Sequence, residues 1–309
     1  MNDRLKVLPQ YLLPKQALTR MAGSFAEARA GALTTKAIRW FIGRYGVNMA
    51  EAANPDPAAY PSFNAFFTRP LKEGARPQAD AEWLCPVDGT ISQFGDLDGE
   101  RLLQAKGHTY TAQALVGGDA ALATYFAHGS FACLYLSPRD YHRIHMPCEA
   151  RVTRMIHVPG ELFSVNPVTA RGVPGLFARN ERVVCVFDGP QGPFVMALVG
   201  ATIVGSVEVN WYGRVTPPRR AELREWCYRQ RPIRMRRGEE MGRFLLGSTV
   251  VMLFPHRLRF NPAWAPGGAI RVGEAMSAEE RRVRRAAAPC AVSPQRPRAA
   301  EGDTPQAGA

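Results

Sequence analysis

The stretch that decides the fold is FVMALVGATIVGSVEVNW, residues 194–211. Valine, isoleucine and aromatic residues, which favour β-strands, dominate it, and glycines interrupt it. Runs of the same kind occupy residues 131–137, 151–158, 182–188 and 249–254, and the turn-forming sequence DGPQG separates two of them. After about residue 83, long helical patterns do not alternate with these runs. The sequence therefore predicts a mainly β core and not a parallel α/β sheet.

The first fifty residues have a different period, which is typical of amphipathic helices. Leu18, Met21 and Phe25 recur at helical spacing between charged residues. A second helix is predicted after them, with Thr34 or Thr35 as its N-cap. Its apolar residues also fall on one side, with lysine and arginine between them. Such helices suit the plane of a membrane interface, but they could equally well pack on their own domain.

Length and composition are those of a folded protein. The chain has 309 residues and a mass of 34.0 kDa, with 46% hydrophobic and 21% charged residues, which excludes global disorder. It contains no uncharged apolar run of about 18 residues, so no transmembrane helix is expected. Prolines and lysines interrupt the N-terminal segment, which therefore does not resemble a signal peptide. We expect the protein to stay in the cytoplasm.

Positive charge is in excess. The chain has 39 lysines and arginines against 27 acidic residues, a formal net charge of +12, and such a surface attracts nucleic acid or anionic lipid. Arginines concentrate in residues 217–243, which are expected to form an exposed basic loop or helix. Six cysteines lie far apart without a CxxC pair, so we expect isolated buried thiols.

Together these patterns predict an α+β protein with a mainly β core, N-terminal amphipathic helices and a disordered C-terminal tail. Residues 1–60 are expected to form the helical segment, and residues 61–276 the β-rich domain. Beyond about Ser277, arginine, alanine, proline and glycine dominate and hydrophobic periodicity stops. Residues 277–309 are therefore predicted to be disordered.

The signatures of several common enzyme classes are missing. The chain has no GxGxxG, GxxxxGK[ST], GxSxG or HExxH motif, which argues against nucleotide cofactors and ordinary serine hydrolases. The densest polar cluster is SPRDYHRIHMP, with His142 and His145 three positions apart. Two imidazoles can act as acids or bases or bind a metal, but no third ligand lies nearby and no metal is expected. The alternative is a hydrogen-bonded pair of loop histidines.

Two further polar residues allow more than one interpretation. Asp88 precedes Gly89, and such a pair commonly forms a turn, but its carboxylate could also orient a histidine. Ser248 follows Gly247 directly ahead of an apolar run. It could simply begin a strand, or its hydroxyl could attack the Gly247 carbonyl, because a residue without Cβ permits a strained backbone there.

Seven blocks stand out along the chain: FNAFFTRPLK (63–72), PVDG (86–89), QAKGHTY (104–110), YHRIHMP (141–147), PGELFSVN (159–166), FARNER (177–182) and LGST (246–249). Each block alone is a weak signal, whereas seven in one order are highly specific. In this order they resemble phosphatidylserine decarboxylases of the membrane-associated bacterial type. The resemblance covers about two-thirds of the chain.

The resemblance implies a proenzyme that cuts its own chain between Gly247 and Ser248. Residues 1–247 would become the β chain and residues 248–309 the α chain. Ser248 would end as a covalent pyruvoyl group at the start of the α chain. The ketone of that group is the electron sink for decarboxylation. Phosphatidylserine would then be converted to phosphatidylethanolamine and CO2 in phospholipid biosynthesis.

The resemblance also assigns roles to the polar residues. The family's proenzyme triad falls on Asp88, His145 and Ser248. His145, oriented by Asp88, would take the Ser248 proton. His142 would assist decarboxylation or reprotonation, and no metal is required. One position departs from the family, because Pro167 stands where we expect a histidine in bacterial relatives, so any role of that histidine would pass to His142.

The partners that the resemblance implies are phosphatidylserine in the membrane and an anionic lipid surface. The protein would be peripheral, on the cytoplasmic face of the cell membrane, and members of the family are often homodimers. Nucleic acid is not expected as a partner. Two rival hypotheses remain. The chain could decarboxylate another amino acid through the same pyruvoyl group, or it could be a non-enzymatic basic protein that binds nucleic acid or acidic lipid through residues 219–237 and is never cleaved.

Overall fold

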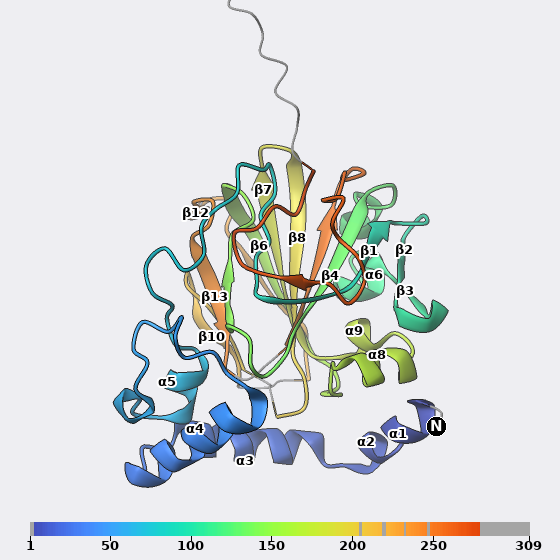
Figure 1. Ribbon diagram of the computed structural model, residues 1–309. Coiled ribbons are helices and arrows are strands. Elements are labelled where there is room, and N and C mark those ends of the chain that lie inside the picture. Colours follow the sequence, from blue (N-terminus) through green and yellow to red (C-terminus); the bar gives the residue numbers. More distant parts are fainter. Residues whose placement is uncertain (1–2, 204–205, 218–220, 232, 246–247, 279–309) are drawn as a thin grey trace, which may run out of the picture. The chain divides into compact units, whose positions relative to one another are not determined.

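The computed structural model describes residues 3–278 except for 204–205, 218–220, 232 and 246–247. Its largest element is a nine-stranded antiparallel sheet (Figure 1). The strand order is β11-β6-β7-β8-β14-β4-β1-β15, and β12 also pairs with β6. These strands are β1 (Gly89–Asp96), β4 (Ser130–Leu136), β6 (Ala150–Val158), β7 (Arg182–Gly189), β8 (Gly192–Val199), β11 (Arg224–Cys227), β12 (Ile233–Met235), β14 (Ser248–Phe254) and β15 (Ala269–Ile270). A mainly β core with helices is therefore confirmed.

The stretch 194–211 supplies a central strand of this sheet. β8 pairs with β7 through the predicted turn and with β14 on its other side. All side chains from Phe194 to Val199 are buried, because both faces of the sheet are covered and neither face needs polar residues. The stretch is not one strand, however. β8 ends at Val199, and β9 (Val207–Val209) belongs to a second sheet.

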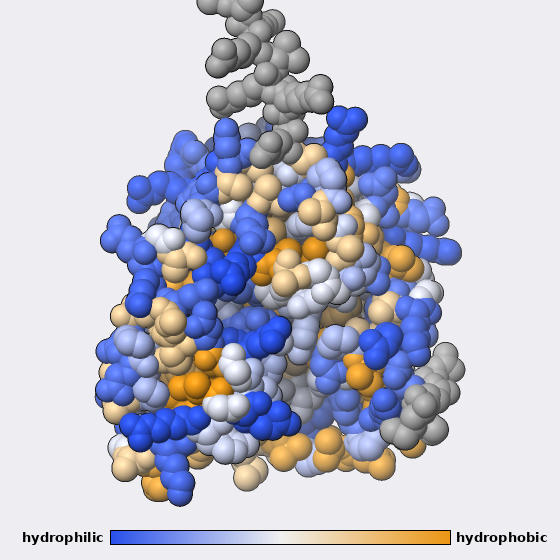
Figure 2. All heavy atoms as spheres, in the orientation of Figure 1, coloured by the Kyte–Doolittle hydropathy of each residue, from blue (hydrophilic) through white to orange (hydrophobic). Residues whose placement is uncertain are grey.

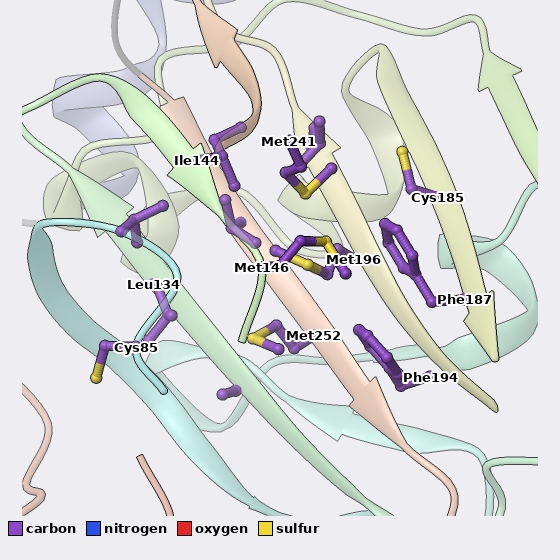
Figure 3. Close-up of a cluster of buried hydrophobic side chains, with 14 of the residues drawn as sticks. Cys85, Leu134, Ile144, Met146, Cys185, Phe187, Phe194, Met196, Met241 and Met252 are labelled. Atoms are coloured by element: carbon purple, nitrogen blue, oxygen red, sulfur yellow. The ribbon is translucent and has the colours of Figure 1, made fainter. Parts of the chain in front are cut away.

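This smaller sheet covers one face of the large one. Its order is β10-β9-β13-β5, with β5 (Arg143–His145), β10 (Gly213–Thr216) and β13 (Glu240–Phe244). Ile144 and Met241 of the small sheet share an apolar cluster with Met196 and Met252 of the large sheet (Figure 3). This core fixes β5 over the sheet that contains β14.

Short helices cover the opposite face. They are α6 (Ala112–Leu115), α7 (Ala120–Thr124), α8 (Pro167–Gly172) and α9 (Leu176–Arg179). A hairpin of β2 (Arg101–Leu103) and β3 (Thr109–Thr111), with the 3-10 turn η2 (Ala105–Gly107) between its strands, lies on the same face. Phe131 and Val251 of the large sheet form a second apolar cluster with Leu176. The Gln104 side chain ties the hairpin to α8 by donating to the carbonyl of Ala170 at 2.7 Å.

The N-terminal helices run along one end of this core (Figure 1). They are α1 (Asp3–Val7), α2 (Pro9–Leu12), α3 (Lys15–Glu27) and α4 (Ala32–Tyr45), followed by η1 (Pro57–Ala59) and α5 (Phe63–Phe67). The two predicted helices are α3 and α4. The predicted cap is wrong, because Thr34 and Thr35 lie inside α4 and Gly31 occupies its N-cap. Gly31 has a φ of 57° there, a conformation that a residue without Cβ adopts readily.

An aromatic cluster joins α4 to α5. The hydroxyl of Ser62 caps α5 by accepting a backbone N–H of its first turn. Phe41 of α4 lies edge-on to three phenylalanines of α5, with ring centroids 5.0 Å from Phe63 and 6.0 Å from Phe66 and Phe67. The two helices are thus held together by interlocking aromatic rings.

The described residues of the arginine-rich segment form strands joined by turns and no helix or single exposed loop, so that prediction is wrong. Its described residues include the edge strands β11 and β12, which pair with β6. Ile233 and Met235 pack on the core, while Arg234 between them is exposed. The apolar positions recruit the segment to the sheet, and charged side chains on an edge strand discourage pairing with other chains.

The tail that the sequence predicts to be disordered begins at residue 277. Residues 279–309 of it lie outside the described residues. Within the described ranges, no helix has the length and apolar character needed to cross a membrane.

Gly89 lies tightly against the backbone of β4. A Cβ at Gly89 would lie 2.2 Å from the carbonyl oxygen of Tyr135, so alanine would force the strands apart. We expect Gly89→Ala to lower the free energy of unfolding by about 1–3 kcal/mol in urea titrations. Gly43→Ala is the control. Gly43 lies in α4, and a Cβ added there would have nothing within 4 Å, so alanine should raise the free energy of unfolding by up to about 1 kcal/mol. Unchanged stability of Gly89→Ala would contradict the close contact.

Candidate active site

Ser248 begins β14, in the middle of the large sheet. Thr90, Tyr135 and Thr249 form one row across β1, β4 and β14. Gly89 and Ser248 each precede this row on the same side. Strand β4 lies between β1 and β14, and neighbouring strands lie about 4.8 Å apart, so the backbone of Gly89 is about 10 Å from that of Ser248. Gly247, on the other side of the predicted cut, lies outside the described residues.

Two connections meet at this end of β14. Residues 137–142 join β4 to β5, and residues 245–247 join β13 to β14. β4 pairs with β14, and β5 pairs with β13. Each connection therefore runs between the strand pair β4–β14 and the strand pair β5–β13, and the two connections lie at the same end of these pairs. The carbonyl of His142 accepts the N–H of Phe244 at 3.0 Å. The loop that carries His142 therefore lies beside Phe244, the last residue of β13, from which the chain leads to the predicted cut.

His142 is a buried base. Its Nδ1 lies 2.8 Å from the carbonyl oxygen of Asp140, which can only accept, so Nδ1 carries the proton and donates it. Its ring centroid is 4.0 Å from that of Phe67, and its Nε2 has no partner within the described ranges. Complete burial, reinforced by the charge of Arg69, lowers the pKa of His142 to about 3. The ring is therefore neutral at pH 7, with a free lone pair on Nε2.

His145 is held at both of its ring nitrogens. Burial lowers its pKa, so this ring is neutral as well. Nδ1 donates to the carbonyl of Gly238 at 2.9 Å, and the hydroxyl of Tyr141 donates to Nε2 at 3.1 Å. The backbone N–H of His145 donates to the carbonyl of Pro86 at 2.8 Å, which sets β5 beside the segment that leads to Asp88.

Asp88 is bound by Arg76, whereas the resemblance implies that its carboxylate orients His145. Arg76 donates to the Asp88 carboxylate from Nε at 2.9 Å and also from Nη2. The N–H of Val272 donates to it at 2.9 Å. The hydrogen bonds of the described residues include none between Asp88 and His145. A forked guanidinium outcompetes a neutral imidazole for a carboxylate, so Asp88 acts on His145 through its charge, which raises the pKa of that ring against the effect of burial.

Arg76 and Tyr141 connect these residues through two neighbouring cavities. His145 lines one of about 220 Å³, and Asp88 lines the other of about 290 Å³; Arg76 and Tyr141 line both. Sequence reasoning did not single out these two residues, nor Arg69, which lines the larger cavity. Tyr141 and Arg69 stand within the quoted blocks, and that is the signal that could have found them. Arg76 lies in a polar loop without any distinguishing pattern.

Pro167 fits its local structure. It is the first residue of α8, where its missing N–H would have no helical partner. Asn166 caps the helix by accepting the N–H of Thr169 at 2.9 Å. The departure from the family therefore preserves the helix start but leaves no ionisable group at position 167. Among the residues with assigned positions, no cluster of three histidine, cysteine or acidic side chains could hold a metal ion.

The chain is similar to known decarboxylases. A family model described as phosphatidylserine decarboxylase matches residues 63–278, and one described as PSD matches residues 5–46. A phosphatidylserine decarboxylase proenzyme from Azoarcus sp. (strain BH72) is 70% identical over 277 residues, which are 89% of this chain and 96% of that protein. Proteins of the same name from Dechloromonas aromatica (strain RCB) and Albidiferax ferrireducens (strain ATCC BAA-621 / DSM 15236 / T118) are 68% and 67% identical, over 89% and 90% of this chain and 98% of each relative.

Burial of neutral His142 makes stability depend on pH. Its pKa of about 3 lies below the 6.5 of a free imidazole, so the unfolded chain binds the proton first as the pH falls. This contribution to stability is complete above about pH 6.5 and is lost towards pH 3, by up to about 1.4 kcal/mol per pH unit. We expect His142→Asn to reduce that slope in urea unfolding measured across this range.

His128 is exposed, so His128→Asn should keep the slope of the wild type and serves as the control. If His142→Asn showed the slope of the wild type, His142 would not be a buried neutral ring.

Proposed function

Because the chain belongs to the phosphatidylserine decarboxylase family, we propose that it cuts itself between Gly247 and Ser248 and that a pyruvoyl group made from Ser248 is its cofactor. The protein is a decarboxylase of phospholipid biosynthesis, with phosphatidylserine as substrate and phosphatidylethanolamine and CO2 as products. The observation that carries the proposal is the loop 137–142, in which the carbonyl of His142 accepts the N–H of Phe244 shortly before the predicted cut, while Nε2 of His142 has no partner among the described residues.

Self-cleavage requires a base, a hydroxyl and a carbonyl carbon. His145 takes the proton of the Ser248 hydroxyl, and Oγ attacks the carbonyl carbon of Gly247. The amide bond between Gly247 and Ser248 breaks, and an ester to Oγ replaces it. Loss of the Ser248 α-proton then breaks the Cβ–Oγ bond and leaves a carboxylate on Gly247. Water finally releases the former Ser248 nitrogen as ammonia.

The hydrogen bond between Tyr141 and His145 must open in this sequence, because the Tyr141 hydroxyl occupies the lone pair that takes the serine proton. Asp88 assists without touching the ring. Its negative charge favours the imidazolium that forms on His145. Arg76 holds the Asp88 carboxylate in place by the two hydrogen bonds described above.

The residues around position 248 suit a group with carbonyl oxygens. Thr249 is completely buried, and its hydroxyl has no partner among the residues with assigned positions. Buried polar groups are normally hydrogen-bonded, so this hydroxyl is available to donate to a carbonyl oxygen. A pyruvoyl group would supply an electron-withdrawing ketone, which accepts electrons as CO2 leaves the substrate.

His142 is suited to move the substrate proton. The amine of phosphatidylserine must lose a proton before it can react with a carbonyl, and Nε2 of His142 has a free lone pair that can accept a hydrogen bond from that amine. The same nitrogen can return that proton to the carbon from which CO2 has left. Position 167 cannot share this task, because proline has no ionisable group.

An exposed apolar surface supports a lipid substrate. We name it the docking surface and define it by five side chains that are 64% to 87% exposed: Leu12, Met21, Phe25, Leu33 and Trp40. All five belong to the N-terminal helices, and Figure 2 shows apolar atoms along the edge of the molecule that these helices form. Large apolar side chains gathered on one face mark an interaction site.

The docking surface is also bordered by positive charge. Arg20, Arg29, Lys36 and Arg39 are exposed on α3, on α4 and between them. Apolar side chains with a basic border suit the interface of an anionic membrane. The helices serve both of the roles predicted for them, because Ala26, Ile38 and Phe41 pack on the protein itself. We therefore propose a peripheral protein on the cytoplasmic face of the cell membrane. The homodimer stays a prediction.

Intact mass spectrometry tests the cofactor. The wild type should give chains of about 27 and 7 kDa, the smaller about 17 Da lighter than a peptide that begins with serine, because ammonia is lost. Ser248→Ala should give one chain of 34.0 kDa and no decarboxylation. Ser206→Ala removes a nearby hydroxyl and should be cut as the wild type is. A cut Ser248→Ala chain would remove Ser248 from its role.

Vesicle sedimentation tests the docking surface. We expect the double variant Phe25→Asp, Trp40→Asp to bind vesicles of phosphatidylcholine and phosphatidylserine at least about tenfold more weakly, because burial of each ring contributes about 2 kcal/mol. Tyr125→Asp is the matched control, since Tyr125 is 61% exposed but borders a cavity with Asp188 and Pro193 at the tip of the β7–β8 hairpin. Equal binding by the double variant and the control would exclude the N-terminal helices as the lipid contact.

A further inference from the structure

Arg69 is buried but not paired. It follows α5, and only 3% of its surface is exposed. Its guanidinium carbon lies 5.3 Å from the centre of the Phe66 ring. Nη2 donates one long hydrogen bond, of 3.4 Å, to the carbonyl of Arg139, and Nε has no partner within the described ranges. The charge therefore has a fixed position and no ion pair among the described residues, and Asp88, Asp140 and Glu51 act on it only from a greater distance.

The other arginines around the same cavity differ from Arg69. The cavity of about 290 Å³ is lined by four arginines. Three of them have a carboxylate within 4.0 Å: Arg76 has Asp88 and Glu51, Arg271 has Glu51, and Arg139 has Asp140. Across the residues with assigned positions, Arg69 alone in this cavity lacks such a partner. The cavity thus contains one uncompensated guanidinium.

An uncompensated buried charge is strongly unfavourable. Burial lowers the pKa of Arg69 from its usual value, but a guanidinium stays protonated in proteins. The group cannot escape the penalty by losing its proton. Asp88, Asp140 and Glu51 offset part of it from a distance, and an anion that enters the cavity and contacts the guanidinium would offset more. A forked guanidinium suits the paired oxygens of a carboxylate or a phosphate.

We propose that Arg69 binds the phosphodiester of the phospholipid substrate in this cavity, an inference that rests on the proposed function. Its position suits that role. The ring of Phe67, two residues before Arg69, lies 4.0 Å from the ring of His142, centroid to centroid, and the charge of Arg69 acts on His142. A headgroup held at Arg69 therefore lies beside the base that moves its proton.

The reaction itself selects the phosphodiester over the substrate carboxylate. The carboxylate loses its negative charge as CO2 leaves, so an ion pair with it would stabilise the ground state more than the transition state. The phosphodiester keeps its charge throughout. Binding it lowers KM without opposing the chemical step, and the product, which retains the phosphodiester, should bind Arg69 equally well.

The test combines kinetics and binding in Arg69→Gln. With soluble dihexanoyl phosphatidylserine, we expect KM to rise about tenfold to a hundredfold, as for the loss of a charged hydrogen-bonded pair, while kcat changes less than about threefold. By calorimetry, glycerophosphoserine and glycerophosphoethanolamine should lose affinity by the same factor, because both contain the phosphodiester. Arg69→Lys should restore part of the loss.

Arg271→Gln is the matched control, since it removes a charge from the same cavity, but one whose side chain is 59% exposed and paired with Glu51. Its KM should stay within about twofold of the wild type. Intact mass should show that Arg69→Gln is cut like the wild type. A variant that remains uncut or unfolded would make Arg69 a residue of maturation or structure and overturn the inference.

Two other results would also overturn it. Loss of affinity for glycerophosphoserine alone would assign Arg69 to the carboxylate, and a fall in kcat with unchanged KM would assign it to the chemical step. Failure of the proposed function looks different, because the wild type itself would then stay uncut. The calorimetric comparison needs no turnover and still decides the role of Arg69 in that case.

Discussion

The backbone hydrogen bonds that hold β14 between β4 and β8 are the constraint on which the site depends. They fix Ser248 at the first position of a strand that is paired along both edges. The same pairing sets the loop 137–142 against the end of β13, and so places His142. A cut before Ser248 leaves this ladder intact, so the new chain end stays in a rigid frame without a covalent link.

Charge around the site is distributed in three ways. Asp88 and Arg76 neutralise each other, His142 is kept neutral by burial, and Arg69 is left unpaired. A chain selected only for stability would pair or remove the last two groups. Under the proposed function, both groups are completed by a molecule that enters the site, and their buried atoms without partners are what suggests roles for them.

The sequence predicted what local pattern and burial control. The apolar, β-branched run 194–199 indicated a strand, and periodicity found α3 and α4. It did not predict that the chain leaves the sheet after Val199, because no residue pattern distinguishes a strand from the irregular continuation. It also missed that Arg76, rather than His145, binds Asp88. Competition for one carboxylate depends on which side chains the folded chain brings within reach, and spacing along the sequence does not contain that information.

The central place of β14 also sets the order of events in the life of the molecule. Leu136 and Val199, whose strands flank β14, lie far upstream, so the geometry around Ser248 exists only after the chain has folded. Under the proposed mechanism, the cofactor is made only by molecules that have passed this checkpoint. The precursor folds as one chain, in a first-order process. Once it is cut, recovery from denaturation becomes a second-order encounter of two chains, one of which has only β14 and β15 as strands among its described residues. Folding and activation are then a one-way sequence.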